Sequence, residues 1–300
     1  MRCASFIPLI GTLLFVFVQS CDGCQDSAVA YSSIQAGFAH ACVLRTDQTV
    51  TCWGAGSRQP NRQLHCGQAI APLGRYRKLS LAGTRSCAIG ENGHLKCWGC
   101  ILPARNLAQD NIPTGRFVSV AVDEFHGCAL REDSSIQCWG RDDLGQSSPP
   151  PGKFIDITVG ESHGCGIRKD HSVTCWGKTG DDAMPPELYF KQISAGDRIT
   201  CGITMDGFLR CWGVGADMIP IVQSDKVSVG WRPCSLDNTG NITCWNLDPN
   251  NPESIMPLDA PLVDVAAGAG FVCGIAENKP VCWRDSRERF VPDFGQASPP

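Results

Sequence analysis

The sequence lacks the motifs of the common enzyme and nucleotide-binding classes. It has no glycine-rich phosphate loop, no His-Glu-x-x-His pair, no Gly-x-Ser-x-Gly elbow and no dense cluster of carboxylates. Charged residues are only 19% of the chain, and the formal net charge of −4 leaves no basic excess for a nucleic-acid backbone. No apolar stretch reaches the 18 or so residues of a membrane-spanning helix. These absences argue against a motif-defined enzyme, a nucleic-acid-binding protein and a membrane-spanning protein.

Cysteine, in contrast, is abundant. Nineteen cysteines in 300 residues are difficult to reconcile with a reducing cytosol unless they bind metal or perform redox chemistry. The 43% apolar fraction supports a packed core. The 32 glycines and 20 prolines favour many short strands joined by turns over long helices.

The first 20 residues have the pattern of a secretory signal peptide. Met1-Arg2 provides a positive start, residues 6–18 form an apolar run, and Val18-Gln19-Ser20 offers a cleavage site. Two alternatives stay open: a buried N-terminal helix, and a bacterial lipobox in which Cys21 is lipidated. We expect residues 21–30 to form a short linker, with Cys21 paired to Cys24 unless Cys21 carries lipid.

Seven repeats make up the rest of the chain. Each contains a Cys-Trp dipeptide, and another cysteine lies nine or ten residues before it. A glycine stands four or five residues ahead of that first cysteine in six repeats, and Asp123 replaces it in the third. The two cysteines of each repeat are, in chain order, Cys42 and Cys52, Cys87 and Cys97, Cys128 and Cys138, Cys165 and Cys175, Cys201 and Cys211, Cys234 and Cys244, and Cys273 and Cys282.

Alternating apolar residues and turn signals predict strands in each repeat. If Cys201 faces Cys211 on antiparallel strands, Met205-Asp206-Gly207 forms a three-residue hairpin loop with glycine at its left-handed position. The seventh repeat is one residue shorter, which leaves the two-residue loop Glu277-Asn278. Loop length and cysteine spacing therefore change together, as facing cysteines require.

Facing residues on antiparallel strands have Cα atoms close enough for a disulfide. We therefore predict seven disulfides, one in each repeat. The alternatives are reduced, buried cysteines and, less favoured, zinc ligation. Cys66 and Cys100 lie in the two longest inter-repeat loops, and we predict that they pair and join the first two repeats.

About 40 residues per repeat is the size of a propeller blade. We predict an all-β, seven-bladed β-propeller over residues 31–294, with four-stranded antiparallel blades, one disulfide per blade and the Cys-Trp tryptophans packed between blades. Residues 295–300 are expected to form a flexible C-terminal tail.

The repeats resemble those of the regulator of chromosome condensation (RCC1) family. Residues 154–177 show its pattern of apolar strand, glycine, two variable residues, histidine, second strand, turn and Trp-Gly, and residues 141–146 resemble its Asn-x-x-Gly-Gln stretch. The Cys-Trp-Gly form is most similar to the secreted branch, as in CRINKLY4-type ectodomains and bacterial secreted repeat proteins. The resemblance implies the propeller fold and no single activity, since family members include an exchange factor and an enzyme inhibitor.

The residues just after the repeat glycine differ most between repeats, and we expect them at the mouth of the central shaft. Aromatic and arginine side chains there are typical of protein-binding hot spots, and Trp231 is the strongest anchor candidate. Ordinary loop variability is the alternative. The candidate rim residues are Phe38, Arg85, Phe125, Glu161, Arg198, Trp231, Arg232 and Phe271.

The interpretation favoured by the sequence is a secreted or surface-tethered, non-catalytic scaffold that binds another protein or an envelope macromolecule. The alternatives are an inhibitor of a secreted enzyme, an exchange-factor-like regulator, and a carbohydrate-active enzyme that would use Glu124, Glu161 and Asp197. We expect no cofactor, no metal site, no nucleic-acid partner and a monomer. His40, His126 and His163 are expected to cap turns, and Asn241 begins a glycosylation sequon.

Overall fold

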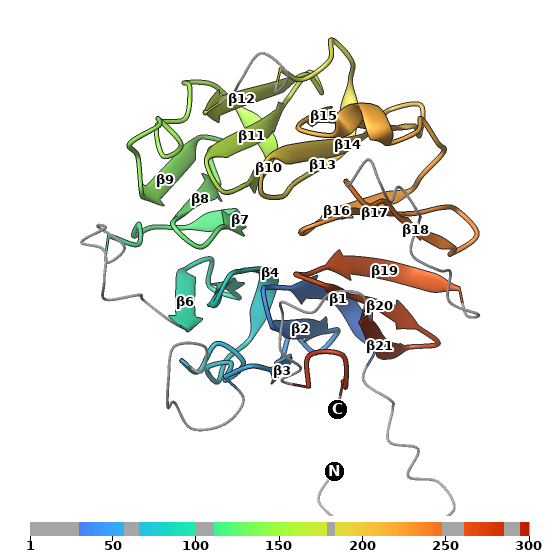
Figure 1. Cartoon of the computed structure of the whole chain (residues 1–300). Helices are drawn as coiled ribbons and strands as arrows, with labels where there is room; N and C mark the ends of the chain where they lie inside the picture. Colours follow the sequence, from blue (N-terminus) through green and yellow to red (C-terminus); the bar gives the residue numbers. More distant parts are fainter. Residues whose placement is uncertain are drawn as a thin grey trace, which may run out of the picture.

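Seven antiparallel sheets surround a central axis in the computed structural model, which describes residues 30–56, 66–99, 111–178, 184–247, 261–284 and 295–299 (Figure 1). The three strands of each sheet follow one another in sequence, so each repeat forms one sheet. This confirms the predicted all-β propeller of seven blades. We number the blades 1 to 7 in chain order.

Each blade contains an inner, a middle and an outer strand. The inner strands are β1 (Tyr31–Ala36), β4 (Tyr76–Ala82), β7 (Phe117–Val122), β10 (Phe154–Val159), β13 (Phe190–Ala195), β16 (Lys226–Val229) and β19 (Leu262–Ala267). The middle strands are β2 (His40–Arg45), β5 (Arg85–Gly90), β8 (His126–Arg131), β11 (His163–Arg168), β14 (Ile199–Thr204), β17 (Pro233–Leu236) and β20 (Phe271–Ala276). The outer strands are β3 (Val50–Gly54), β6 (Leu95–Gly99), β9 (Ile136–Gly140), β12 (Val173–Gly177), β15 (Leu209–Gly213), β18 (Ile242–Cys244) and β21 (Lys279–Arg284).

The hairpin register agrees with the one predicted from cysteine spacing. Cys201 pairs with Cys211, and Gly207 has a φ of 88° at the left-handed position of the intervening loop. In blade 7, Cys273 faces Cys282, and Glu277 and Asn278 both have positive φ, as a two-residue hairpin loop requires.

All seven predicted intra-blade disulfides are present, and each joins the middle strand to the outer strand. Their Cα–Cα distances are 4.0–4.1 Å. The bonds join Cys42 to Cys52, Cys87 to Cys97, Cys128 to Cys138, Cys165 to Cys175, Cys201 to Cys211, Cys234 to Cys244 and Cys273 to Cys282.

The middle-strand cysteines are all fully buried, but the outer-strand cysteines are not all equally covered. Cys244 is buried, but the other six are only partly buried, because an outer strand lies at the edge of its blade; they are Cys52, Cys97, Cys138, Cys175, Cys211 and Cys282. The alternative of reduced, buried cysteines does not apply to these seven pairs, because all are bonded.

The other cysteines are only partly accounted for. Cys66 is also disulfide-bonded. Cys3, Cys21, Cys24 and Cys100 lie outside the described residues, so the pairing of Cys66 with Cys100 stays a prediction.

The expected fourth strand is not found among the described residues, where every sheet has three. Residues 141–153 and 214–225 are described throughout, and they form turns, bends and a 3-10 helix, η2 (Ala216–Met218). After blade 5 the connecting segment makes one isolated antiparallel β-bridge, between Phe208 and Gln223. Loop-internal hydrogen bonds, such as that from Ser147 Oγ to the Arg141 carbonyl, satisfy these connecting segments instead of a fourth sheet ladder.

The hydrophobic core lies between adjacent blades, and the Cys-Trp tryptophans belong to it as predicted. Trp53 of blade 1 packs with Phe271 and Ile275 of blade 7, so the same kind of contact closes the ring. Trp176 packs with residues of blades 3 and 4, and Trp212 packs with residues of blades 4 and 5. Each blade thus buries its apolar face against its neighbours.

Hydroxyl groups opposite the first cysteine of a repeat join neighbouring inner strands. Ser80 accepts a hydrogen bond from the Val122 amide of the next blade at 3.0 Å, and Thr158 accepts one from the Ala195 amide at 2.8 Å. Ser194 and Ser228 make the equivalent contacts. These bonds satisfy inner-strand amides that have no strand partner on the side facing the shaft.

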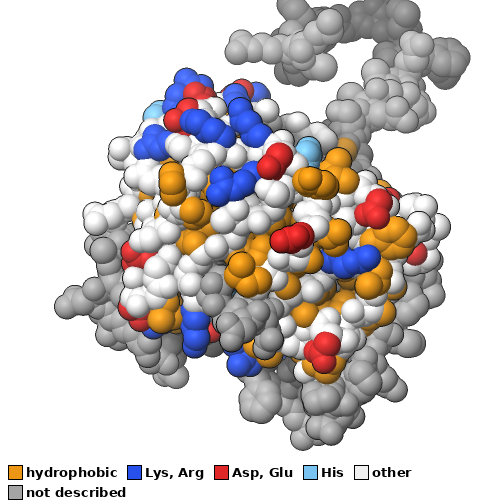
Figure 2. Space-filling model, turned by 90° about the horizontal axis from the view of Figure 1, so that it is seen from above, with side chains coloured by type: hydrophobic (Ala, Val, Ile, Leu, Met, Phe, Trp, Pro, Cys, Tyr) orange, Lys and Arg blue, Asp and Glu red, His pale blue; other side chains and the backbone are white. Residues whose placement is uncertain are grey.

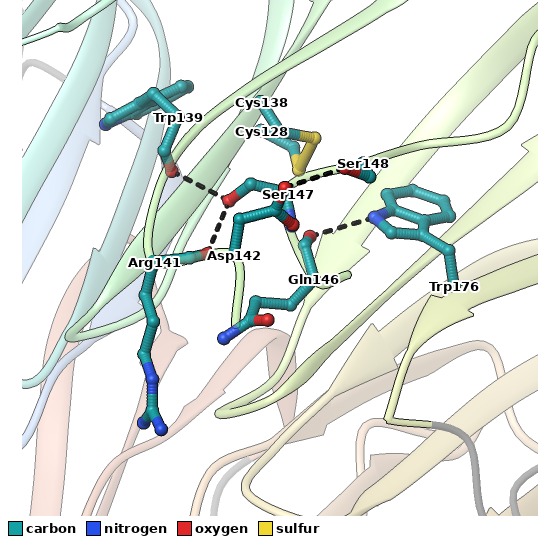
Figure 3. Close-up of a disulfide and its surroundings, with 9 residues drawn as sticks. All are labelled: Cys128, Cys138, Trp139, Arg141, Asp142, Gln146, Ser147, Ser148 and Trp176. Atoms are coloured by element: carbon teal, nitrogen blue, oxygen red, sulfur yellow. Dashed lines mark hydrogen bonds between the residues drawn. A yellow bond between two sulfur atoms is a disulfide. The ribbon is translucent and has the colours of Figure 1, made fainter. Parts of the chain in front are cut away.

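Three turns that follow a blade contain a Gly-Gln dipeptide, and the glutamine carbonyl of each binds the tryptophan of the next blade. We call them Gly-Gln turns; they contain Gly67-Gln68, Gly145-Gln146 and Gly295-Gln296. The Gln146 carbonyl, after blade 3, accepts a hydrogen bond from Trp176 Nε1 of blade 4 at 3.0 Å (Figure 3). The Gln68 carbonyl does the same for Trp98, and the Gln296 carbonyl for Trp53. Gln296 is fully buried although residues 295–300 were expected to be a flexible tail. Its turn repeats the Gly-Gln pattern, and the hydrogen bond from Trp53 therefore holds this end of the chain against blade 1.

The remaining features concern the surface and the N-terminus. The face shown in Figure 2 carries charged side chains of both signs, with a group of Lys and Arg at one edge and hydrophobic side chains in small separate groups. In the described part of the chain, no helix has the length and apolar character needed to cross a bilayer. The predicted signal peptide and most of the linker lie outside the described residues.

Candidate functional site

The hairpins between inner and middle strands converge at one end of the shaft, which we call the mouth. They surround a cavity of about 290 Å³ that has lining residues from all seven blades. The repeat glycines make this convergence feasible. A Cβ on Gly160 would lie 2.1 Å from the Gly196 carbonyl oxygen, and one on Gly196 would lie 2.4 Å from the Gly230 carbonyl oxygen. Glycine at this position therefore lets the hairpins of adjacent blades approach closely.

Asp123 stands at the glycine position of blade 3 and lines the cavity beside Glu124. Its Oδ2 accepts a hydrogen bond from the Phe125 amide at 3.4 Å. Burial in the cavity wall raises the pKa of Asp123 to about 7. The departure of this residue from the glycine pattern was visible in the sequence, but it was not predicted to belong to the site.

Glu161 and Asp197 form a carboxyl pair on the wall contributed by blades 4 and 5. A hydrogen bond between their side chains, followed by desolvation and the charge of Asp197, raises the pKa of Glu161 to about 7. The Glu161 amide also donates to the Asp197 carbonyl at 3.3 Å. At pH 7 Glu161 is therefore protonated in about half of the molecules, and this proton favours its hydrogen bond to Asp197.

An aromatic pair lies elsewhere on the mouth, formed by blades 1 and 6. The rings of Phe38 and Trp231 meet edge to face with centroids 5.4 Å apart, and both residues line the cavity. Trp231 is 42% exposed, which is unusual for tryptophan in this protein because the described Cys-Trp tryptophans are at least partly buried. The cavity thus combines an apolar, exposed aromatic surface with a carboxylate-rich wall.

The structure divides the eight predicted rim residues into three groups: four line the cavity, two lie outside it and two are buried. Phe38, Phe125, Glu161 and Trp231 line the cavity. Arg198 is exposed at the edge of the mouth, outside the cavity lining, and Arg232 lines a small neighbouring pocket.

Two of the predicted rim residues are buried, which corrects the prediction for them. Arg85 is 5% exposed, next to the charges of Asp123 and Glu124. Phe271 is 2% exposed and packs in the core between blades 7 and 1. Both occupy the first position of a middle strand, which points between blades instead of into the loop.

The histidines at that same strand position connect blades. His40 Nε2 lies 2.8 Å from Ser86 Oγ of blade 2, and His163 Nε2 lies 2.7 Å from Thr200 Oγ1 of blade 5. His126 is fully buried, and neither of its ring nitrogens has a hydrogen-bond partner among the described residues. Burial lowers the pKa of His40 to about 3 and that of His126 to about 4. Within the described ranges no group of three or more His, Cys, Asp or Glu side chains could hold a metal ion.

Comparison with known families gives a match between residues 31–59 and the regulator of chromosome condensation (RCC1) repeat. The chain carries an RCC1 repeat and has the RCC1-like fold. Solved structures of similar fold include the ectodomain of the Physcomitrella patens receptor kinase CR4, at 22% identity and a TM-score of 0.67, over 86% of this chain and 74% of that one. No curated protein matches the sequence.

Two further solved structures support this RCC1-like fold. The CRINKLY WD40 ectodomain of the Arabidopsis thaliana receptor kinase ACR4 matches at 22% identity and a TM-score of 0.67, over 88% of this chain and 99% of that one. Prp20p from Saccharomyces cerevisiae, described with its binding to Gsp1p and histones, matches at 16% identity and a TM-score of 0.63, over 86% of this chain and 83% of that one. At these identities the similarity shows the RCC1-like propeller and leaves the role of the mouth to be argued from its own residues.

Proposed function

We propose that this chain is an exported, non-catalytic propeller that binds another protein through the mouth. The observation that carries the proposal is that the most variable loops of the seven repeats meet around one cavity with an exposed tryptophan at its edge. Concave sites with aromatic anchors and a few polar groups are typical of binding surfaces.

The disulfides support the exported location. A bond in every blade is typical of proteins that fold in an oxidising compartment. Two structures of similar fold are receptor ectodomains. The signal peptide and lipidation of Cys21 belong to this proposal as well, as does any glycan on Asn241, whose side chain is exposed beside Asp237 and Thr239.

The carboxyl pair fits a glycoside hydrolase less well. Retaining enzymes place their two carboxyl groups about 5 Å apart, and inverting enzymes place them farther apart to admit a water molecule. Glu161 and Asp197 are instead hydrogen-bonded to each other, which is a shorter separation. This geometry favours binding over glycan cleavage.

Site-specific photo-crosslinking tests the proposal. A benzophenone side chain is placed at Trp231 in the full chain and, as a control, at Tyr189, which is aromatic, 62% exposed and lies at the opposite end of the shaft, before β13 begins. In the extracytoplasmic fraction of the host we expect the 231 probe to capture a defined protein that the 189 probe does not. Capture from 189 alone, or equal capture from both, contradicts a binding site at the mouth.

A further inference from the structure

We propose that the mouth cavity receives a lysine or arginine side chain presented by a loop of the partner protein. This inference rests on the proposed function and names the chemistry of the group that would be bound. Three features of the cavity carry it: its size, the sign of its charge and the position of its aromatic surface.

The size of the cavity suits one side chain. About 290 Å³ lies at the lower end of the range for pockets that hold drug-sized ligands. The hairpin backbones at the repeat glycines are in close contact around the ring, so the cavity has little capacity to widen. A protruding side chain with a flexible stem fits this space better than a folded surface would.

The lining selects a positive charge. Four carboxyl groups face the cavity, those of Asp123, Glu124, Glu161 and Asp197, and no lysine or arginine is among the lining residues. The raised pKa of Glu161 indicates that its pair with Asp197 lacks a sufficient counter-charge, although Arg141 and Arg198 lie near enough to act on Glu161. Arg85, which is outside the cavity lining, acts on Asp123 and Glu124. A basic group entering between the carboxyl groups supplies that charge in a partly desolvated site, where it is worth more than in water.

The aromatic pair gives a surface for the rest of the basic group. Trp231 presents its ring at the mouth with Phe38 packed edge to face against it, which holds the indole in place. Cations bind best over the face of a tryptophan, and the methylene stem of lysine or arginine packs on apolar surface. The carboxylates and the indole can therefore contact different parts of the same side chain.

A titration with defined peptides tests the inference. Hexalysine, hexaarginine and hexaglutamate are added to the full oxidised chain, and the indole N–H signal of Trp231, assigned with Trp231→Phe, is followed by NMR. We expect hexalysine and hexaarginine to shift this signal and hexaglutamate to leave it unchanged. No shift with either basic peptide overturns the inference.

Matched variants separate the cavity from general surface charge. The double variant Glu161→Gln with Asp197→Asn neutralises the carboxyl pair, and Glu132→Gln with Asp133→Asn makes the same change at a hairpin tip at the other end of the shaft, between β8 and β9. We expect the dissociation constant of hexalysine to rise about tenfold in the first variant and less than about twofold in the second. An equal effect of the two variants shows binding by surface charge only and contradicts the inference.

Replacing the indole provides an independent measurement. Trp231→Leu removes the aromatic face, whereas Trp231→Phe keeps a weaker one, so binding of hexalysine should weaken more in the leucine variant. If the two variants bind hexalysine equally, the proposed contact between the basic side chain and the indole face is refuted. If crosslinking from position 231 succeeds while the peptides do not bind, the proposed function stands and only the basic side chain is refuted.

Discussion

The contribution to stability of a hydrogen bond between a Gly-Gln turn and the next blade can be measured, because the chain contains an internal control. Trp176 and Trp212 occupy equivalent positions in blades 4 and 5, are 6% and 4% exposed, and pack near Phe154 and Phe190 respectively. Trp176 Nε1 donates to the Gln146 carbonyl at 3.0 Å, whereas Trp212 Nε1 has no partner among the described residues. Trp→Phe at the two positions therefore removes similar packing but only one hydrogen bond.

The size of the difference follows from the burial of Gln146, which is fully buried. Trp176→Phe leaves its carbonyl without this donor, and an unsatisfied buried acceptor costs about 1–3 kcal/mol. Trp212→Phe instead removes a buried donor that is already unsatisfied, which is expected to offset part of its packing loss. The unfolding free energy should fall by about 1–3 kcal/mol more for Trp176→Phe, or about 2–5 °C in Tm for a chain of this size. Urea unfolding of the oxidised proteins measures this, and equal losses would refute the docking role of the turn.

Three further predictions concern the disulfides and the titrating groups. The double variant Cys165→Ser with Cys175→Ser should lower the unfolding free energy by about 3 kcal/mol, and a non-reduced digest of the parent chain should yield Cys165 linked to Cys175. His126 binds its proton more weakly in the folded state, with a pKa of about 4, so the folded state loses stability as pH falls from about 6.5 towards 4. Between pH 7 and 5, thermal and urea unfolding of His126→Gln should therefore show about 2 kcal/mol less acid destabilisation than the parent, and an unchanged pH profile would contradict this. A bound cation must displace the proton of Glu161, and one that also contacts Asp123 must displace a second proton, because both groups have a pKa of about 7. The calorimetric affinity for hexalysine should therefore rise from pH 6 to pH 8, by at most about tenfold for each proton displaced. A flat or falling affinity would be inconsistent with that proton release.

Much of the fold could be predicted because one constraint repeats seven times. Facing cysteines set the strand register, and the loop between them changes length only where the cysteine spacing does, as at Glu277 and Asn278. The number of strands per blade could not be predicted in the same way. The segments between blades vary in length and composition, and those at residues 141–153 and 214–225 satisfy their polar groups in turns.

The site was predicted less completely because its residues meet across blades. Glu161 and Asp197 belong to different repeats, and only the ring geometry brings equivalent loops of adjacent repeats together. Arg85 and Phe271 were placed on the rim because they follow the repeat glycine closely, yet the first position of a middle strand faces the next blade. The Gly-Gln pattern was recognised at Gln146 alone, although Gln68 and Gln296 repeat it.

The central claim, that the partner sits on the mouth, is tested most directly by amide hydrogen exchange of the chain with and without the crosslinking partner. The account predicts slower exchange at the mouth hairpins, residues 37–39, 123–125, 160–162, 196–198 and 230–232, and no change at the opposite hairpin tips, residues 46–49, 132–135 and 169–172. Protection at the opposite tips with none at the mouth would contradict it.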